Sequence, residues 1–277
     1  SGRTDGLLES CSGSDTCPKI IQSDGEAEIW QARASLLVTD PAGGHIELPD
    51  NVRVYLISGT RHGGGGGVHV ATPRAGICQN LNNPLAMRDI RSAMSVALYG
   101  WVADGTVPPP SRFPTVANGG LVSAPELGFP RTPGVTYSGS YNPLRLNDHR
   151  SFPPKQGTAY TVLVGRVDAD GNMTDGVRHP NLTVPIGTHT GWNLRREGFA
   201  EGAQCAGAGS FIPFEADLAA RKAAGDPRLS LEERYSSHDA YVRAVARAAN
   251  ELVRDRLLLE ADAEAIVRLA QQSSVRR

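Results

Sequence analysis

The sequence predicts an α/β fold built on a parallel sheet. Two apolar runs, residues 18–23 and 52–58, have the length and composition of buried strands, and a helical pattern separates them. Strands that alternate with helices are typical of parallel sheets. The second run stops at Gly59 and is followed by His62 and a loop of five consecutive glycines. Ligands and catalytic groups collect at the carboxyl edge of such sheets, so this histidine is the first functional candidate.

The first predicted unit runs strand, acidic loop, helix, strand. The strand over 18–23 opens onto a stretch that contains three acids, Asp24, Glu26 and Glu28. A helix follows, because apolar side chains recur at helical spacing at Ile29, Ala32, Leu36 and Leu37. Residues 39–50 are rich in turn-forming types and lead into the strand over 52–58.

A long helix and a long irregular segment are predicted next. Asn83 and Pro84 are residue types of an N-cap and a first helical position, and the apolar period continues to Ala103. Residues 105–157 contain ten of the 19 prolines and little periodicity. So long a connection is uncommon in a compact domain. We expect it to be ordered by apolar anchors, namely Phe113, Leu121, Phe129, Tyr137 and Tyr141.

The last third is predicted to contain a hairpin and two amphipathic helices. Alternation over 160–167 indicates a strand, residues 168–172 a hairpin turn, and residues 183–186 a further extended stretch. The glycine of the Asp168-x-Asp-Gly-Asn turn is misplaced for a calcium loop. Ser230 and Glu233 match a capping box. Helical spacing then runs from about Ser237 to Arg256 and from Glu260 to Gln272.

Composition excludes several classes of partner. The net charge is −1 and the isoelectric point is near 6.6, so neither nucleic acid nor an anionic membrane surface is expected as a partner. No run of about 18 apolar residues occurs, so no membrane-spanning helix is expected. The chain opens at Ser1 rather than at a methionine, and we expect it to begin within a longer protein.

The four cysteines allow three pairings. Cys11 and Cys17 bracket a short polar loop, a spacing compatible with a local disulfide, and Cys78 would then pair with Cys205 by elimination. Paired cysteines favour an oxidising, extracytoplasmic compartment. The alternative is four unpaired thiols in a cytosolic protein.

His62 can serve a catalytic triad. In such a site the histidine takes the proton of a serine nucleophile, and a carboxylate holds the imidazole in the required tautomer. The acid precedes the histidine on the loop of an earlier strand in one large class of these enzymes. That order places the acid among Asp24, Glu26 and Glu28. The serine motif G-x-S-x-G is absent from the sequence. The alternative interpretation of His62 is a loop histidine hydrogen-bonded to backbone.

Other candidate motifs carry weaker signals. The glycine run 63–67 lacks the Lys-Ser/Thr of a phosphate loop and is interpreted as a mobile loop beside His62. His69 could share a metal with His62, but no third ligand lies at suitable spacing, so neither a metal nor a cofactor is expected. The remaining histidines are expected at the surface or in turns: His45, His149, His179, His189 and His238.

Nine segments spread along the chain carry a family resemblance. They are Thr4–Leu8, Thr16–Ile20, Glu28–Gln31, Tyr55–Gly63, Cys78–Leu81, Pro108–Arg112, Asp168–Asn172, Thr190–Arg195 and Leu231–Tyr235. Together they resemble the poorly characterised family of large proteins described as α/β-hydrolase-domain proteins. His62 matches that family's histidine after the last core strand. Glu28 matches its glutamate before an aromatic pair, although Ile29 stands where an aromatic is usual. On this match we favour Glu28 over Asp24 and Glu26.

The resemblance implies that residues 1–277 form the C-terminal part of one α/β-hydrolase domain with an incomplete sheet, the last core strands. Residues 1–104 would hold these strands, with helices, the acid and the histidine. Residues 105–200 would form a proline-rich irregular insertion and a small β-hairpin region, and residues 201–277 a helical C-terminus. The implied activity is hydrolysis of a small-molecule carboxylic ester, with the serine upstream of this chain. The chain alone is then expected to be inactive.

Two other functions compete with this interpretation. A binding or scaffold domain could keep the hydrolase fold without its chemistry. Metal-assisted hydrolysis through His62, His69 and an acid would require bound zinc, and we rank it last.

Overall fold

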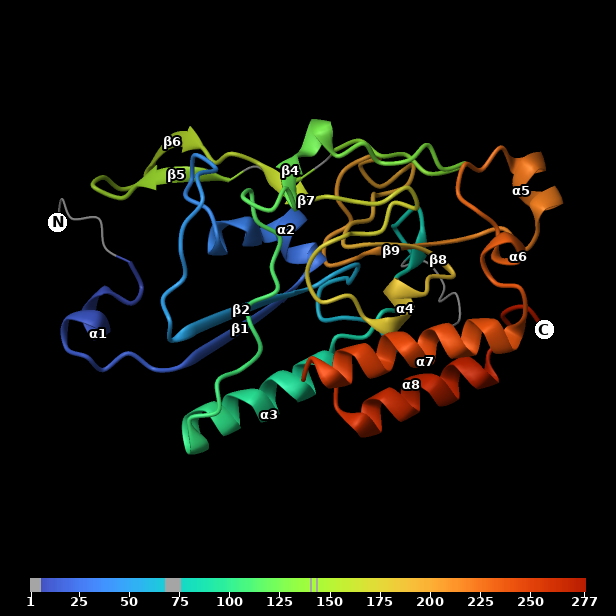
Figure 1. The fold of residues 1–277 in the computed structure, drawn as a ribbon. Coiled ribbons are helices and arrows are strands. Elements are labelled where there is room, and N and C mark those ends of the chain that lie inside the picture. The colour runs from blue at the N-terminus through green and yellow to red at the C-terminus, as the bar shows by residue number, and fades with distance from the viewer. Residues whose placement is uncertain (1–5, 68–75, 140, 143) are drawn as a thin grey trace.

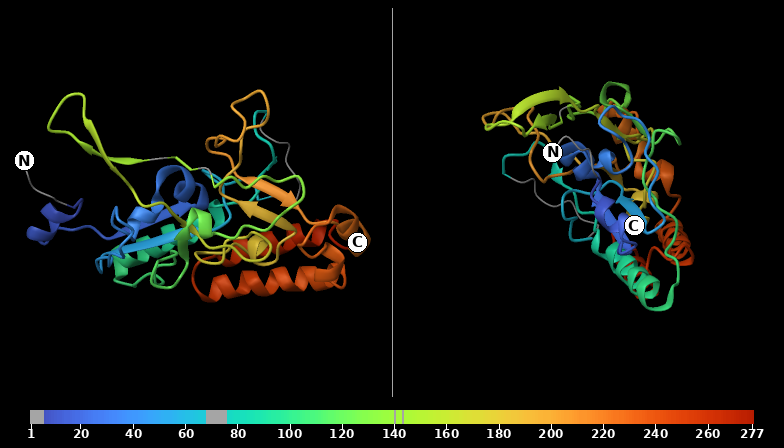
Figure 2. Two further views of the ribbon diagram at one scale, coloured as in Figure 1. Left: turned by 90° about the horizontal axis from the view of Figure 1, so that it is seen from above. Right: turned by 90° about the vertical axis from the view of Figure 1, so that its left-hand side faces the viewer.

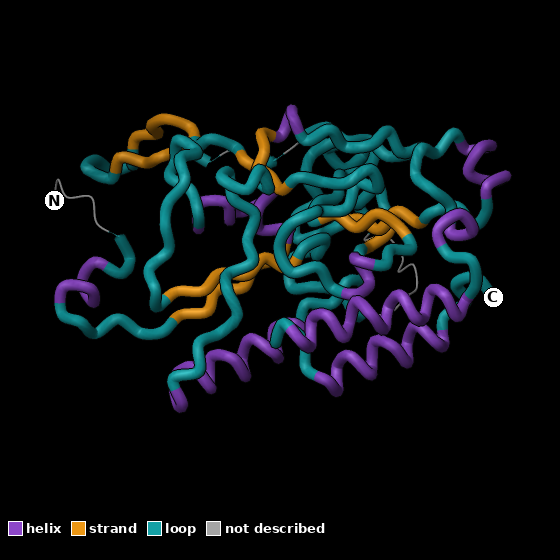
Figure 3. Tube along the Cα trace, viewed as in Figure 1, coloured by secondary structure: helices purple, strands orange, loops and turns teal. Residues whose placement is uncertain are grey.

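The computed structural model describes residues 6–67, 76–139, 141–142 and 144–277. Figure 1 shows a mixed α/β arrangement in which strands are short and connections are long, and Figure 3 shows how much of the centre is loop. The helices are α1 (Glu9–Gly13), α2 (Glu26–Ala32), α3 (Arg88–Asp104), α4 (Pro180–Thr183), α5 (Leu218–Ala224), α6 (Leu231–Arg234), α7 (His238–Arg254) and α8 (Glu260–Gln272), with 3-10 turns η1 (Ala34–Leu37) and η2 (Ala124–Glu126). The strands are β1 (Ile20–Gly25), β2 (Val52–Ile57), β3 (Leu81–Asn82), β4 (Leu121–Ser123), β5 (Arg145–Asp148), β6 (Lys155–Ala159), β7 (Leu163–Gly165), β8 (Gly187–Thr190) and β9 (Ser210–Pro213).

Strands β1 and β2 form the predicted parallel pair. Their register aligns Ile20 with Val52 and Gly25 with Ile57, so both carboxyl ends lie at one edge. On its other side β2 bonds two short segments in parallel, at Arg112 and at Val177. Because strand side chains alternate between faces, β2 contributes to two cores.

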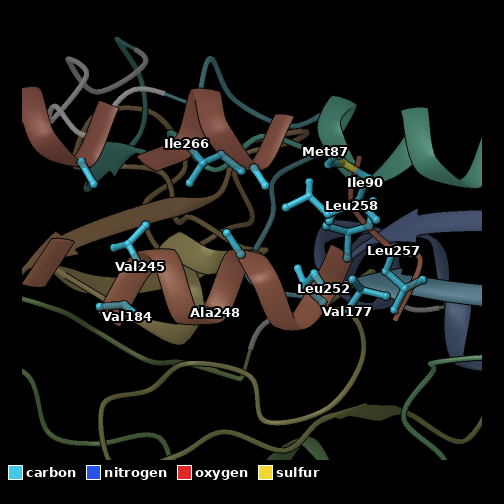
Figure 4. Close-up of a cluster of buried hydrophobic side chains, with 14 of the residues drawn as sticks. Met87, Ile90, Val177, Val184, Val245, Ala248, Leu252, Leu257, Leu258 and Ile266 are labelled. Atoms are coloured by element: carbon cyan, nitrogen blue, oxygen red, sulfur yellow. The ribbon is translucent and has the colours of Figure 1, made fainter. Parts of the chain in front are cut away.

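One core lies between β2 and the C-terminal helices. Tyr55 and Ile57 point to this side, where they join apolar residues of α3, α7 and α8. Figure 4 shows the contact, with Val245, Ala248 and Leu252 of α7 facing the others. The other core takes Val52, Val54 and Leu56, together with Ile29 and Trp30 of α2 and anchors from the proline-rich segment. The β1–β2 pair is therefore covered on both faces.

Several predicted boundaries are wrong, and each error has a local cause. The helix at residue 26 ends at Ala32 because Arg33 adopts a left-handed conformation, and a 3-10 turn replaces its continuation. Helix α3 begins at Arg88, not at Asn83. Asn83 is buried, where its side chain donates to the carbonyls of Gly59 and Thr190 and accepts from Leu85 N–H. Helix α7 ends at Arg254, before Arg256.

The proline-rich segment contains more regular structure than expected. Strand β4 pairs with β7, and β5 pairs with β6 as an antiparallel hairpin that extends away from the body (Figure 2). The predicted strand over 160–167 shortens to β7. Of the expected anchors, Phe113 and Leu121 are buried, whereas Tyr141 is exposed and lies against the Arg33 guanidinium.

Two predictions are wrong at the three-stranded sheet, whose strand order is β3-β9-β8. The extended stretch predicted over 183–186 covers the last residue of α4 and the loop that follows, and the strand begins at Gly187. His189 in β8 is buried against Phe211 rather than exposed. His179 is also buried, at the N-cap of α4.

Other predictions are confirmed. Ser230 and Glu233 form the capping box, although the helix it begins, α6, is short. Helix α8 has the predicted bounds. Residues 168–172 form a turn in which Asp168 N–H donates to the Asn172 carbonyl. Both expected disulfides, Cys11–Cys17 and Cys78–Cys205, are present. In the part of the chain that the structure describes, no helix is long and apolar enough to span a membrane.

The buried His179 supports a prediction about acid stability. Its Nε2 lies 3.4 Å from Asp89 Oδ2 on α3, and this contact is the main cause that lowers the pKa of the Asp89 carboxyl. A lowered pKa in the folded state gives stability that is present above the unfolded value of 3.8 and is lost as the pH falls through the folded value.

We therefore expect the D89N variant to lack this acid-dependent loss. The difference in melting temperature between wild type and D89N should be largest near neutral pH and shrink below about pH 4. Thermal unfolding followed by circular dichroism over this range measures it. A difference that stays constant with pH would contradict the linkage.

Candidate active site

The parallel strands bring two predicted residues to one edge. Glu28 lies three residues beyond the end of β1 in the first turn of α2, and His62 lies five residues beyond the end of β2. The connection is tight at Gly25, where an added Cβ would lie 2.7 Å from Thr60 Oγ1 and 2.9 Å from Glu28 Oε2. A side chain at this position would therefore displace the acid.

His62 and Glu28 are in direct contact. His62 Nδ1 lies 2.6 Å from Glu28 Oε1, and Glu28 Oε2 accepts a hydrogen bond of 2.9 Å from Gly25 N–H. The Glu28 side chain is 17% exposed and that of His62 is 73% exposed. An ionised carboxylate can only accept, so the proton of this contact belongs to Nδ1 and leaves Nε2 as the free base of a neutral ring.

Glu26 has a structural environment. It is buried, and its two carboxylate oxygens accept from the backbone N–H groups of Gly59 and Gly191 and from the indole of Trp30. Burial is the main cause that raises the pKa of Glu26, and these hydrogen bonds oppose it. The side chain joins the start of α2 to the residues after β2 and β8, and in the described structure it makes no hydrogen bond to His62.

Asp24 makes no hydrogen bond with His62 in the described structure. Its carboxylate accepts from the Gln22 amide at 3.0 Å, and burial is the main cause that raises its pKa. Of the three acids that the sequence offered, only Glu28 touches the imidazole.

The glycine run is packed rather than loose over its described part. Gly65 N–H donates to the Leu85 carbonyl and Gly67 N–H to that of Pro84. An added Cβ at Gly65 would lie 2.4 Å from the backbone of Pro84, so this position excludes any side chain. His69 lies outside the described residues, so the metal alternative stays a prediction.

Residues that the sequence did not suggest surround the pair. Gln31, one helical turn after Glu28, accepts a hydrogen bond of 2.7 Å from Gly207 N–H. A Cβ on Gly207 would lie 3.9 Å from His62 Cβ, and one on Gly209 would lie 3.0 Å from Arg61 Cβ. The Cys78–Cys205 disulfide anchors the start of this 207–209 segment. Only the spacing of Gln31 from Glu28, on one helix face, was visible in the sequence.

The arrangement can perform general base chemistry. An oriented imidazole with one nitrogen held by a carboxylate and the other open to solvent is the base half of a triad. Among the residues that the structure describes, no serine hydroxyl hydrogen-bonds His62.

Comparison with known proteins assigns the family. The model of the family described as "Alpha/beta hydrolase domain" matches residues 3–268. No curated protein and no solved structure shows a significant match to the chain. With the match extending over nearly the whole chain, this protein belongs to the α/β-hydrolase-domain family.

Proposed function

We propose that this chain is the acid–histidine part of a serine hydrolase that cleaves carboxylic esters. The observation that carries the proposal is the contact of 2.6 Å between His62 Nδ1 and Glu28 Oε1, at the carboxyl edge of a parallel strand pair. Family membership supports hydrolysis in general. The ester class is inferred from the chemistry of acyl transfer.

The proposed mechanism uses both nitrogens of the imidazole. Nε2 removes the proton from a serine hydroxyl as the oxygen attacks the ester carbonyl, and Glu28 stabilises the imidazolium that forms. The ring then returns the proton to the leaving alcohol, which produces an acyl-enzyme. Water repeats the steps and releases the acid. Backbone N–H groups near the serine would hold the oxyanion.

We propose that the serine belongs to a segment outside these 277 residues, as the absence of G-x-S-x-G suggests. The outer edge of β1 supports this. In the described structure β1 pairs with β2 alone, and a cavity of about 180 Å³ lined by Ile21, Ser23 and residues of α3 lies beside it. A further parallel strand added at this edge would end near Glu28 and His62.

The activity of the isolated chain tests this proposal. Purified 1–277 should hydrolyse activated esters no faster than its H62A variant and should resist labelling by a fluorophosphonate, because it lacks the nucleophile. A polypeptide that joins this sequence to a serine-bearing segment should react, and its H62A variant should not. Serine-dependent turnover by 1–277 alone would refute the external serine.

The same experiment tests the alternative of a non-catalytic binding domain, which is also consistent with the missing G-x-S-x-G motif. If the longer polypeptide also fails to react with the fluorophosphonate, the hydrolase proposal fails and a binding or scaffold domain remains.

A further inference from the structure

We propose that Arg61 and Gln31 form a subsite for a carboxylate of the substrate, beside the His62–Glu28 pair. The subsite deepens the proposed ester hydrolysis and rests on it for its role. With this subsite, the substrates would be esters that carry a second, anionic group. Its ligand binding can be measured without catalysis.

Arg61 is a half-buried arginine without a partner. It directly precedes His62, so the two Cα atoms are about 3.8 Å apart. Its Nε is buried and makes no hydrogen bond, and no carboxylate of the described residues forms an ion pair with it. Arg228 and Arg234, by contrast, form ion pairs with Asp226 and Asp170. The Nε atoms of Arg33, Arg178 and Arg195 are also buried without a hydrogen bond, but only Arg61 is next to His62. A desolvated guanidinium donor that the fold leaves unused is available to a ligand.

Gln31 contributes a second unused donor. Its Oε1 accepts from Gly207 N–H, which fixes the amide so that Nε2 is buried without a hydrogen-bond partner. Gln31 is one helical turn from Glu28, so both side chains project from the same face of α2.

The two donors meet the catalytic pair at one segment, residues 207–209. Gln31 hydrogen-bonds Gly207, His62 approaches Gly207, and Arg61 packs on Gly209. Glycines at these positions let the neighbouring side chains come close, since a Cβ on Gly209 would lie 2.3 Å from the Thr190 carbonyl oxygen. The segment thus brings an unpaired cation and an unpaired amide donor to the edge of the proposed active site.

The chemistry of the donors favours a carboxylate. A guanidinium presents paired N–H groups that match the two oxygens of a carboxylate, and an amide N–H can bond the same anion. The nearest acids are committed elsewhere, since the oxygens of Glu28 bind His62 and Gly25, and those of Glu26 bind backbone N–H groups. One cation next to the Glu28 charge suits a singly charged anion better than a phosphate dianion.

The test is binding of benzoate to 1–277, followed by NMR at the Arg61 Nε–H and the Gln31 amide. Benzamide serves as the neutral analogue and inorganic phosphate as the second anion. Benzoate should shift both signals, and benzamide should not. R61Q should weaken benzoate binding roughly tenfold to a hundredfold, as for loss of a charged hydrogen bond. R61K should retain part of the affinity, which separates charge from misfolding.

R243Q is the matched control, because Arg243 is exposed on α7 and the variant changes the net charge equally. Equal benzoate affinity in R61Q and wild type would overturn the subsite, as would benzamide binding as tight as benzoate or phosphate binding tighter than benzoate. Benzoate binding at Arg61 in a protein whose serine-containing form is inactive would refute the proposed hydrolysis but keep the subsite.

Discussion

Replacing Glu28 by glutamine is expected to lower kcat of the serine-containing enzyme by about 10⁴-fold. The carboxylate accepts the Nδ1 proton of His62 at 2.6 Å and so fixes which nitrogen faces the substrate. A glutamine amide can donate instead, which favours the tautomer with the proton on Nε2. The base nitrogen is then blocked, and no anion is present to stabilise the imidazolium.

The structure provides matched controls for this prediction. His45 Nε2 lies 3.1 Å from Glu47 Oε1 in a similar contact, which is not at the carboxyl ends of β1 and β2. E47Q therefore changes the same chemistry without affecting the site. D24N tests the competing acid, which hydrogen-bonds Gln22 rather than His62. Both variants should retain kcat within about tenfold, which is small against the effect expected for a triad acid.

The NMR tautomer of His62 checks the physical cause separately. In 1–277 the imidazole should carry its proton on Nδ1, and E28Q should shift the population toward Nε2–H. If E28Q retained activity within tenfold and the same tautomer, Glu28 would not be the triad acid.

The sequence was sufficient to predict the candidate pair for a topological reason. The apolar runs at 18–23 and 52–58 identified parallel strands, and parallel strands end at one edge whatever the rest of the fold does. Choosing Glu28 over Asp24 needed the family resemblance, because the sequence does not show which of three acids within five residues points toward the histidine. Their separate environments, one on His62, one on backbone amides and one on Gln22, depend on tertiary contacts.

The errors share a second cause, which is long-range contact that local patterns do not encode. Asn83 has the residue type of a helix N-cap, yet the carbonyls of Gly59 and Thr190, 24 and 107 residues away, bind its amide. His189 was expected at the surface or in a turn, but strand pairing places it against Phe211. Arg61 gave no signal, and Gln31 none beyond its spacing from Glu28, for a related reason: the 207–209 segment that both approach is distant in sequence.

Removing the Cys78–Cys205 disulfide is expected to cost about 5 kcal/mol of unfolding free energy, the largest stability effect we predict. The bridge joins residues 127 positions apart, and cross-linking a long loop restricts the unfolded chain more than cross-linking a short one. Domains are stable by only about 5–15 kcal/mol, so the C78A/C205A variant should be close to unfolding at room temperature.

The second disulfide is the internal control. Cys11 and Cys17 are six positions apart, and the same relation gives about 2 kcal/mol for C11A/C17A. Denaturant unfolding of both double variants, without added reductant and at equal protein concentration, measures the difference. Equal losses would mean that restriction of the unfolded chain is not what the long bridge contributes.

Loss of the long bridge should also reach the candidate site, whereas loss of the short one should not. Cys205 is two residues from Gly207, whose N–H holds Gln31 and whose backbone lies beside His62. When the bridge is absent, the 207–209 segment retains only its hydrogen bonds, so its amide protons should exchange faster in C78A/C205A than in C11A/C17A. The two variants are compared under conditions in which both remain folded. Faster exchange confined to this segment would mean that the long disulfide also orders the edge of the candidate site, in addition to restricting the unfolded chain.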